Sequence, residues 1–234
     1  SFVEGSNNQL AKAASVSVGD SPGQTSFNPL VIYGGVGLGK THLLQAIGNK
    51  VLQRSPKPRV HYTTSEKFTI DFISAIQNNS SSSFTERHRN VDTLLVDDIQ
   101  FFQKKEQTQE QFFHTFNDLY QRGKQVVLTT DRHPSELYGL KDRLLSRFQS
   151  GLIVDIQAPN LETRIAILQK KAEEDKLEIP YEITELIATN IRGNIREMEG
   201  ALIKLLAYSS LSHSDITMPL AKRALRETLG RSGT

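Results

Sequence analysis

The chain contains no cysteine and no tryptophan, and only 2 of its 234 residues are methionine. The absence of cysteine excludes disulfide bonds, thiolate metal sites and cysteine nucleophiles, and it is typical of a reducing compartment. No Ser-His-Asp arrangement for nucleophilic catalysis is recognisable. The six histidines show no His-Glu-x-x-His spacing, so surface or packing roles are expected for all of them. They are His42, His61, His88, His114, His133 and His213.

The sequence also lacks any long hydrophobic run. No segment approaches the roughly 18 apolar residues that a membrane span needs, and no charged-then-apolar leader opens the chain. We therefore expect a cytoplasmic protein. A large excess of charge is missing too, because 28 Lys and Arg stand against 26 Asp and Glu and leave a formal charge of +2. Any nucleic-acid contact must then come from local patches. Because the first residue is Ser1 rather than Met, we expect a segment of a longer protein.

Five short stretches rich in β-branched or aliphatic residues alternate with segments of helical length. Apolar runs with little alternation indicate strands covered on both faces, and their alternation with helices indicates a parallel sheet. The predicted strands run from Leu30 to Tyr33, Val60 to Thr63, Thr93 to Val96, Gln125 to Thr129 and Leu152 to Ile156. The fold class predicted from this pattern is α/β.

The sequence changes character after Ala158-Pro159-Asn160, where strand signals stop and about four amphipathic helices follow. Pro180 and Pro219 stand near two of the expected helix starts, where proline is well tolerated. We therefore expect an α/β subdomain over residues 1–158 and an all-helical subdomain over residues 159–234. Within the first, the serine run Ser80 to Ser83 predicts a mobile turn.

The stretch Gly34-x4-Gly39-Lys40-Thr41 follows an apolar strand directly and precedes a helical pattern directly, which is the context that a phosphate-binding loop requires. Glycines let the backbone wrap closely around phosphate groups, and the helix N-terminus faces the anion. Lys40 then reaches the β- and γ-phosphates, and the Thr41 hydroxyl is a ligand for Mg²⁺. The alternative is a glycine-rich turn with a chance Lys-Thr. The expected nucleotide-binding residues are Gly35, Val36, Gly37, Leu38, Gly39, Lys40, Thr41 and His42.

A second motif is the apolar strand that ends in Asp97-Asp98. An acid in this place puts a carboxylate at the carboxyl edge of the sheet, so Asp97 is the expected metal-side residue. Asp98 points elsewhere and is the candidate for polarising an attacking water. The alternative is an acid that merely caps the next helix. At the end of the fourth strand, Thr130 and Asp131 fit two roles equally, a γ-phosphate sensor or the start of a turn.

Arginines form the third group of candidates. Arg143 and Arg147 are four residues apart and predict one helix face, while Arg196 stands near another helix start. Surface salt bridges are the alternative interpretation. Together with the loop and the acidic strand end, these arginines predict a site completed by several elements.

Five stretches taken together resemble the ATPase domain of the DnaA family of bacterial replication initiators, within the AAA+ class of P-loop ATPases. They read FVEGSNNQLAKAA, NPLVIYGGVGLGKTHLLQAIGN, LLVDDIQFFQKKEQTQEQFFHTFN, DRLLSRFQSGL and NIREMEGAL. The resemblance implies a five-stranded parallel sheet in the order 5-1-4-3-2 with a helical lid. It also implies ATP or ADP with Mg²⁺ as cofactors, and a cytoplasmic, nucleoid-associated bacterial protein.

The same resemblance implies roles for single residues. Arg147 matches the arginine finger, which enters the ATP site of a neighbouring subunit, and Arg143 matches a further sensor arginine of that motif. Arg196 matches the lid arginine that contacts the nucleotide of its own subunit, and Val3 and Asn8 match a segment near adenine and ribose. In this family residues 65–90 carry an insertion of two helices. Contacts to single-stranded DNA map onto Ile73, Lys105, Gln107 and Thr108, although Gln107 supplies no positive charge where some relatives have arginine.

The function that the resemblance implies is an ATP-regulated initiator that binds ATP-Mg, assembles head-to-tail into a filament and stretches single-stranded origin DNA. Slow hydrolysis to ADP and phosphate resets it. A replicative helicase or its loader is a further expected partner. Two alternatives stay open, namely a helicase loader or initiator regulator of the same ATPase class, and a P-loop kinase for a small molecule. A missing acceptor-site signature speaks against the kinase.

Overall fold

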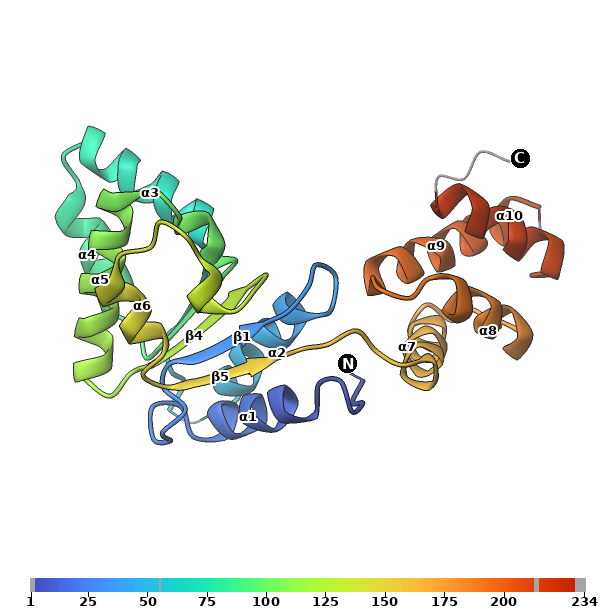
Figure 1. Ribbon diagram of the computed structural model, residues 1–234, viewed down its shortest axis with the longest axis horizontal. Coiled ribbons are helices and arrows are strands. Elements are labelled where there is room, and N and C mark those ends of the chain that lie inside the picture. Colours follow the sequence, from blue (N-terminus) through green and yellow to red (C-terminus); the bar gives the residue numbers. More distant parts are fainter. Residues whose placement is uncertain (1–2, 55, 213–214, 230–234) are drawn as a thin grey trace. The chain divides into compact units, whose positions relative to one another are not determined.

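The computed structural model describes residues 3–54, 56–212 and 215–229. Its centre is a five-stranded parallel sheet (Figure 1). The strand order is β2-β3-β4-β1-β5, which confirms the expected order. The strands are β1 (Leu30–Tyr33), β2 (Val60–Thr64), β3 (Thr93–Asp97), β4 (Gln125–Thr130) and β5 (Leu152–Asp155). Because all strands are parallel, their carboxyl ends meet at one edge of the sheet, where ligands of open α/β sheets bind.

One face of the sheet is covered by α1 (Gln9–Asp20) and α2 (Lys40–Leu52), which contact each other. The opposite face is covered by helices that share one hydrophobic core with the sheet. They are α3 (Ser65–Gln77), α4 (Ser81–Arg89), α5 (Glu106–Gln121) and α6 (Asp142–Phe148), with the short 3-10 helices η1 (Ile99–Phe102) and η2 (Pro134–Glu136) between them. Burial on both faces explains the apolar runs of β1, β3 and β4, whereas the edge strand β2 is only partly buried.

Phe68 fixes α3 to this core. Its ring is fully buried and lies in edge contact with Phe84 of α4, Phe102 of η1 and Phe112 of α5, at centroid separations of 5.2, 5.8 and 5.4 Å. Edge-to-face pairs add stabilisation of about 0.5–1.5 kcal/mol each beyond the burial of area. The α3–α4 pair is therefore packed firmly on the sheet rather than loosely attached to it.

The expected turn at Ser80 to Ser83 is wrong, because α4 spans Ser81–Arg89 and only Ser80 precedes it. Serine suits a helix N-terminus as well as a turn. The burial of Phe84 and His88, four residues apart, gives this short segment the apolar stripe of a helix.

The remaining elements are helices α7 (Leu161–Glu174), α8 (Tyr181–Asn190), α9 (Ile195–Ser212) and α10 (Met218–Thr228). They enclose a second core around Leu168, Ile187 and Leu205. Pro180 is the N-cap of α8, and Pro219 lies in the first turn of α10, in keeping with the restricted φ of proline.

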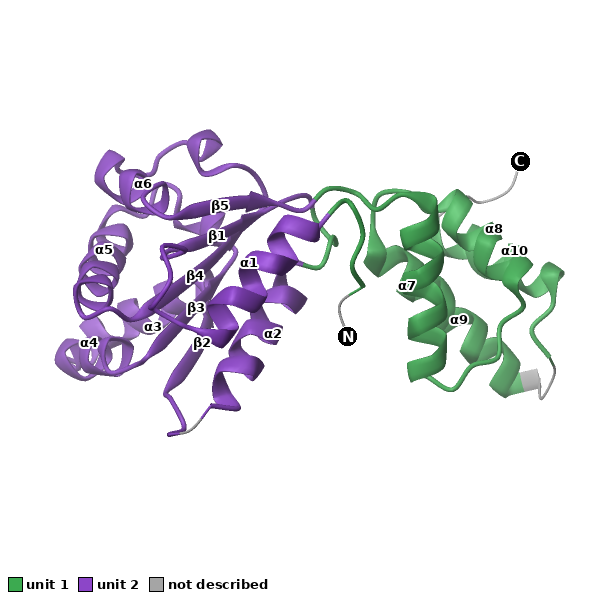
Figure 2. Cartoon of the chain, turned by 90° about the horizontal axis from the view of Figure 1, so that it is seen from below, with its two compact units in different colours: residues 1–7, 36–39, 157–234 green, residues 8–35, 40–156 purple. Residues whose placement is uncertain are grey.

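The chain divides into two compact units, which Figure 2 distinguishes by colour. Unit 1 comprises Ser1–Asn7, Val36–Gly39 and Gln157–Thr234, and unit 2 comprises Asn8–Gly35 and Lys40–Ile156. Unit 1 is thus assembled from three separate stretches of sequence. None of the helices within the described ranges is long and apolar enough to cross a membrane.

Candidate functional site

The loop between β1 and α2 has the backbone conformation of a phosphate cradle. Gly37 and Gly39 have φ angles of 74° and 100°, which side chains other than glycine rarely adopt. Lys40 is the first residue of α2, so the first amides of this helix follow the loop directly. Those amides lack partners inside the helix and attract anions.

Lys40 fits a bound polyphosphate. Its ammonium donates hydrogen bonds of 2.7 Å to the carbonyl oxygen of Gly34 and 2.8 Å to that of Gly35. The residue is only 7% exposed. A buried ammonium is costly unless its donors are satisfied, and here the loop carbonyls satisfy them. The positive charge is thereby held inside the glycine loop.

Asp97, the last residue of β3, accepts hydrogen bonds from hydroxyl groups of three different elements. Thr41 of α2 donates to Oδ2 at 2.7 Å, Tyr62 of β2 donates to the same oxygen at 3.1 Å, and Thr129 of β4 donates to Oδ1. Asp97 is 2% exposed. Burial, together with the negative charge of Asp97, raises the pKa of Tyr62 to about 12, so this phenol stays protonated as a donor.

The chemistry of this cluster fits Mg²⁺. A threonine hydroxyl and a carboxylate oxygen lie within hydrogen-bonding distance of each other at the carboxyl edge of the sheet, and Mg²⁺ takes oxygen ligands of both kinds. The described residues contain no group of three or more His, Cys, Asp and Glu that could hold a metal on their own. A metal at Thr41 and Asp97 would take its other ligands from phosphate and water.

Asp98 follows in a left-handed conformation, with φ of 58° and ψ of 52°. Its N–H donates to Thr129 Oγ1 at 2.9 Å, its carbonyl accepts from the hydroxyl of Ser65 at 2.5 Å, and its carboxylate accepts from the amide of Gln100 at 3.1 Å. The left-handed turn directs Asp98 away from the course of β3. Adjacent acids in sequence therefore have separate surroundings, as general-base chemistry beside a metal requires.

The end of β4 is joined to the phosphate loop, because the N–H of Gly34 donates to the carbonyl of Thr130 at 3.2 Å. The Thr130 hydroxyl is buried and has no hydrogen-bond partner among the described residues. Asp131 forms an ion pair of 2.7 Å with its neighbour Arg132. Of these two sensor candidates, Thr130 thus has the unsatisfied polar group.

The two arginines of α6 have different surroundings. Arg143 forms an ion pair with Glu110 and lies over the ring of Phe113, 4.7 Å from its centroid. This arginine, followed by Lys141, lowers the pKa of Glu110 to about 2. Arg147 lies 5.9 Å from the ring centroid of Tyr120 and has no acidic partner in the described part of the chain. Arg147 is therefore the cation of α6 whose charge is left for an external group.

Within unit 1, the start of α9 is fixed to the tip of the glycine loop. The N–H of Ile195 donates to the carbonyl of Gly37 at 3.1 Å, and the N–H of Arg196 donates to the side chain of Asn194 at 3.0 Å. A Cβ atom at Gly37 would lie 2.0 Å from Asn194 Oδ1, so this position requires glycine for contact as well as for φ. Arg196 is the second residue of α9.

The N-terminal candidates fall in different units. Val3 belongs to unit 1, where the neighbouring Asn7 exchanges hydrogen bonds of 2.9 and 3.0 Å with the backbone of Gln157. Asn8 belongs to unit 2, is buried and directly precedes α1. Among the histidines, His213 lies outside the described residues.

The candidates for DNA contact lie at two places in unit 2. Ile73 of α3 is 47% exposed. Lys105 precedes α5, and Gln107 in its first turn is exposed. Thr108 is only 4% exposed, so it offers the backbone N–H of a first helical turn rather than its hydroxyl. The two places therefore offer one apolar side chain and one cationic helix N-terminus.

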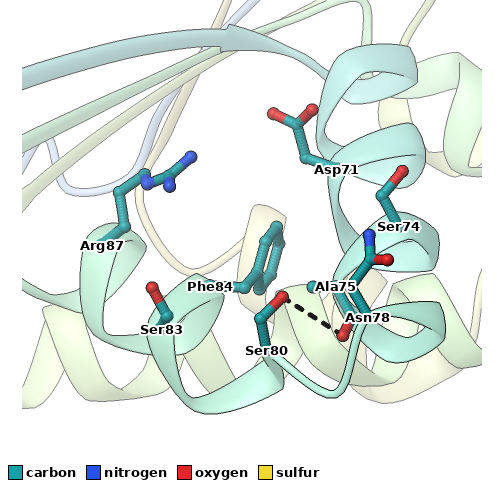
Figure 3. A pocket seen from close by; sticks show the side chains of 8 residues that line it. All are labelled: Asp71, Ser74, Ala75, Asn78, Ser80, Ser83, Phe84 and Arg87. Carbon is teal, nitrogen blue, oxygen red and sulfur yellow. Dashed lines mark hydrogen bonds between the residues drawn. The ribbon is translucent and has the colours of Figure 1, made fainter.

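A polar pocket of about 200 Å³ lies between α3 and α4 (Figure 3). Asp71 and Arg87 lie on opposite sides of it, and Ser80 donates to the carbonyl of Ala75 at one end. Because side chains of both charges line this open pocket, its lining does not indicate one class of ligand.

Sequence reasoning did not identify Tyr62, Ser65 and Asn194 as site residues. Tyr62 and Ser65 reach the acid pair because β2 is the neighbour of β3 in the sheet. The only sequence signal is their place at the end of a predicted strand, and that signal becomes informative once the strand order is given.

Comparison with known proteins gives concordant matches. The family model described as the bacterial DnaA ATPase domain matches residues 1–155. Domain III of the replication initiation protein DnaA from Thermotoga maritima is 43% identical over 98% of this chain and 95% of its own, with a TM-score of 0.94. A replication initiator DnaA solved with AMPPCP and single-stranded DNA is 40% identical, with a TM-score of 0.81, covering 91% of this chain and 66% of that one.

AMPPCP-bound DnaA from Aquifex aeolicus is also 40% identical, with a TM-score of 0.80, and the match covers 90% of this chain and 65% of that one. This chain therefore spans just under two thirds of the length of the DnaA chains in the two AMPPCP-bound structures.

Proposed function

Because the chain belongs to the bacterial DnaA family, as its ATPase domain, we propose that it binds ATP with Mg²⁺, assembles head-to-tail in that state and holds single-stranded origin DNA. One observation supports this most directly. The loop lysine, the Thr41 hydroxyl and the Asp97 carboxylate meet at the carboxyl edge of the sheet through Lys40–loop and Thr41–Asp97 hydrogen bonds. These are the groups that cradle phosphates and hold the metal in P-loop ATPases.

In nucleotide binding, the amides of Gly35 to Gly39 surround the phosphates, and Lys40 exchanges its loop carbonyls for phosphate oxygens. Thr41 and Asp97 hold the metal, with Tyr62 and Thr129 orienting the carboxylate. Bound Mg²⁺ supplies neutralisation of the charge that develops on the phosphates. Two solved structures of DnaA contain AMPPCP, which supports this assignment.

In hydrolysis, Asp98 orients and polarises the attacking water, since its carboxylate is partly exposed and separate from Asp97. General-base assistance of this kind contributes about 10²–10⁴-fold. We propose that turnover is slow and acts as a reset, because holding a DNA strand depends on which nucleotide is bound rather than on how fast it is consumed.

In assembly, Arg147 enters the ATP site of the next subunit, and its lack of an acidic partner in the described chain supports that role. Arg143 is held by Glu110 in the same motif. Arg196 reports the nucleotide of its own subunit. Val3 and Asn8 lie near adenine and ribose, and Thr130 with Asp131 senses the γ-phosphate.

In DNA binding, a strand contacts Ile73 of α3 and the N-terminus of α5. There Lys105 supplies charge, and the first-turn amides of Gln107 and Thr108 face a phosphate. A relative solved with AMPPCP binds single-stranded DNA, which supports this proposal. Replicative helicase or its loader is a further proposed partner.

The test is fluorescence anisotropy of a labelled single-stranded oligonucleotide titrated with this chain in ATP-Mg, ADP-Mg or no nucleotide. We expect tight, cooperative binding in ATP alone. Equal binding in all three conditions would refute the nucleotide switch, and no binding in any of them would favour a helicase loader or regulator.

A further inference from the structure

Asp98 is one of four described non-glycine residues with positive φ, together with Asn79, Lys104 and Lys176. The other three are exposed, whereas Asp98 is partly buried beside Asp97. A side chain other than glycine is disfavoured in the left-handed region, so neighbouring groups must hold such a residue there. What holds Asp98 therefore also decides where its carboxylate points.

Three side chains perform this task through hydrogen bonds, in addition to the N–H of Phe101, which donates to the carbonyl of Asp98 at 3.2 Å. Thr129 of β4 accepts from the N–H of Asp98, and Gln100, two residues further on, donates to its carboxylate. The third comes from Ser65, whose hydroxyl donates to the carbonyl of Asp98 at 2.5 Å. The hydroxyls of Thr129 and Ser65 thus hold the two peptide groups that flank the Cα of Asp98.

Ser65 differs from the other two because it is the first residue of α3. It is fully buried, and its own carbonyl accepts a hydrogen bond of 2.7 Å from Thr69. The preceding Thr64 caps the helix by accepting from the N–H of Lys67 at 3.0 Å. The Ser65 hydroxyl is therefore held on a capped helix end and has little freedom to leave Asp98.

We propose that Ser65 is a positioning residue for ATP hydrolysis, acting through Asp98; this rests on the proposed function, in which Asp98 polarises the attacking water. The hydroxyl holds the left-handed turn after β3, and the turn aims the carboxylate at the water. Without the hydroxyl, the carbonyl of Asp98 keeps only the 3.2 Å hydrogen bond from the N–H of Phe101, and the residue relaxes toward a more favourable φ. Ser65 contacts neither Asp97 nor the phosphate loop through any hydrogen bond of its side chain, so nucleotide affinity does not depend on it.

The same bond joins the acid to the helix that carries Ile73. Ile73 follows Ser65 by eight residues on α3, about 12 Å along the helix axis. The residue that aims the hydrolytic acid is thus the anchored end of the helix proposed to contact DNA.

The experiment compares Ser65→Ala, Ser65→Cys and Asp98→Asn with the parent chain. Single-turnover hydrolysis of pre-bound ATP with Mg²⁺ gives the rate, and titration with a fluorescent ATP analogue gives the Kd. A misplaced catalytic group costs up to about a hundredfold in rate. We expect Ser65→Ala to be about ten- to hundredfold slower with its Kd within about twofold of the parent. Ser65→Cys, with a weaker donor of similar size, lies between parent and Ser65→Ala.

Thr115→Ala is the matched control, since Thr115 is a fully buried helix residue whose hydroxyl donates to the carbonyl of Gln111 at 3.0 Å, away from the acids. It should lose stability in thermal unfolding but keep the parent rate of hydrolysis.

A Ser65→Ala rate within twofold of the parent, with Asp98→Asn inactive, overturns the proposal and leaves the proposed function intact. Loss of ATP affinity in Ser65→Ala as large as its loss of rate also overturns it. Hydrolysis by Asp98→Asn at the parent rate would instead refute the role of Asp98 itself.

Discussion

The hydroxyl of Thr41, the second residue of α2, donates a hydrogen bond of 2.7 Å to Oδ2 of Asp97 at the end of β3. The two residues are 56 positions apart in sequence, and parallel strand order brings them together. This bond joins the start of α2 to the acidic strand end inside unit 2. The metal-side half of the site is thereby complete within one compact unit.

Asp97→Asn should weaken the binding of Mg²⁺ at the proposed nucleotide site. The amide preserves shape but removes the negative charge that Thr41, Tyr62 and Thr129 surround. Disturbing a metal site in this way costs about 10–100-fold in metal affinity. The half-saturating Mg²⁺ concentration for hydrolysis should rise by about that factor. Tyr62→Phe removes one of the three donors and should give a smaller rise. An unchanged Mg²⁺ titration for Asp97→Asn would place the metal elsewhere.

Lys40→Ala should weaken ATP binding about ten- to hundredfold, because hydrogen bonds to charged groups contribute about 1.5–3 kcal/mol. The variant also leaves the carbonyls of Gly34 and Gly35 without their donor. Isothermal titration with ATP and with ADP measures both affinities. Lys50→Ala is the control, because Lys50 lies on the same helix but pairs with Asp20 at the surface, at 2.7 Å. Equal losses in the two variants would show that the charge of α2 matters and not the loop contact.

Arg147→Ala should bind ATP as the parent does and fail to assemble on single-stranded DNA. Truncating one partner of a buried charge pair costs about 2–5 kcal/mol, which corresponds to at least thirtyfold weaker association. Sedimentation velocity with ATP, Mg²⁺ and an oligonucleotide gives the assembly state. Arg122→Ala is the control, since Arg122 is a surface arginine of the same unit paired with Asp118. The arginine-finger assignment is lost if Arg147→Ala assembles at the parent concentration.

Much of the fold could be predicted because apolar strands and a glycine loop are local signals. The expected strand Thr93 to Val96 differs from β3 by one residue, and the first strand matches β1 in full. The order of parallel strands depends on long crossovers, so it came from family resemblance and not from the residues. The turn expected at Ser80 to Ser83 failed because a local serine preference was overridden by tertiary burial of Phe84.

The site likewise combines residues that the sequence indicates with residues that it does not. The glycine loop with its lysine and the acidic strand end are contiguous sequence motifs, and the structure places Thr41 beside Asp97. Tyr62 and Ser65 are ordinary residues in sequence, and only the pairing of β2 with β3 gives them a role. Likewise, no sequence pattern indicates that the tip of the loop at Gly37 bonds to Ile195. Contacts that depend on sheet order and on distant segments follow only from the folded structure.

The packing of α4 on β2 should make stability depend on pH between about 6.5 and 4. The rings of His61 and His88 are in edge contact, with centroids 4.9 Å apart. Burial, followed by the neighbouring His88 and Arg87, lowers the pKa of His61 to about 4. Burial is also the main cause that lowers the pKa of His88, against the carbonyl of Phe84 and Asp71, which raise it. Of the charged groups facing the pair, Arg87 and Lys67 favour the neutral rings and Asp71 opposes them.

Because both folded pKa values are lower, the unfolded chain binds more protons than the folded chain as the pH falls below 6.5. The contribution of the two neutral rings to stability is therefore complete above about pH 6.5. As the pH falls further, this contribution decreases by up to about 1.4 kcal/mol per pH unit for each histidine, until the folded rings protonate, near pH 4 for His61. The side chain of Lys124 and the backbone of Arg59 lower the pKa of Asp92 to about 2. Asp92 therefore keeps its contribution to stability until the pH falls below the ordinary aspartate pKa near 4. The two effects therefore occupy separate ranges.

Urea unfolding at pH 7.5, 6.5, 5.5 and 4.5, followed by circular dichroism, measures this dependence for the parent and for His61→Val. Valine suits the strand position and cannot take up a proton. We expect the unfolding free energy of the parent to fall more steeply with acid than that of His61→Val, by up to about 1.4 kcal/mol per pH unit. The contact of α4 with β2 would then be the acid-sensitive part of the fold. Parallel pH profiles for the two proteins would assign the acid sensitivity to groups other than His61.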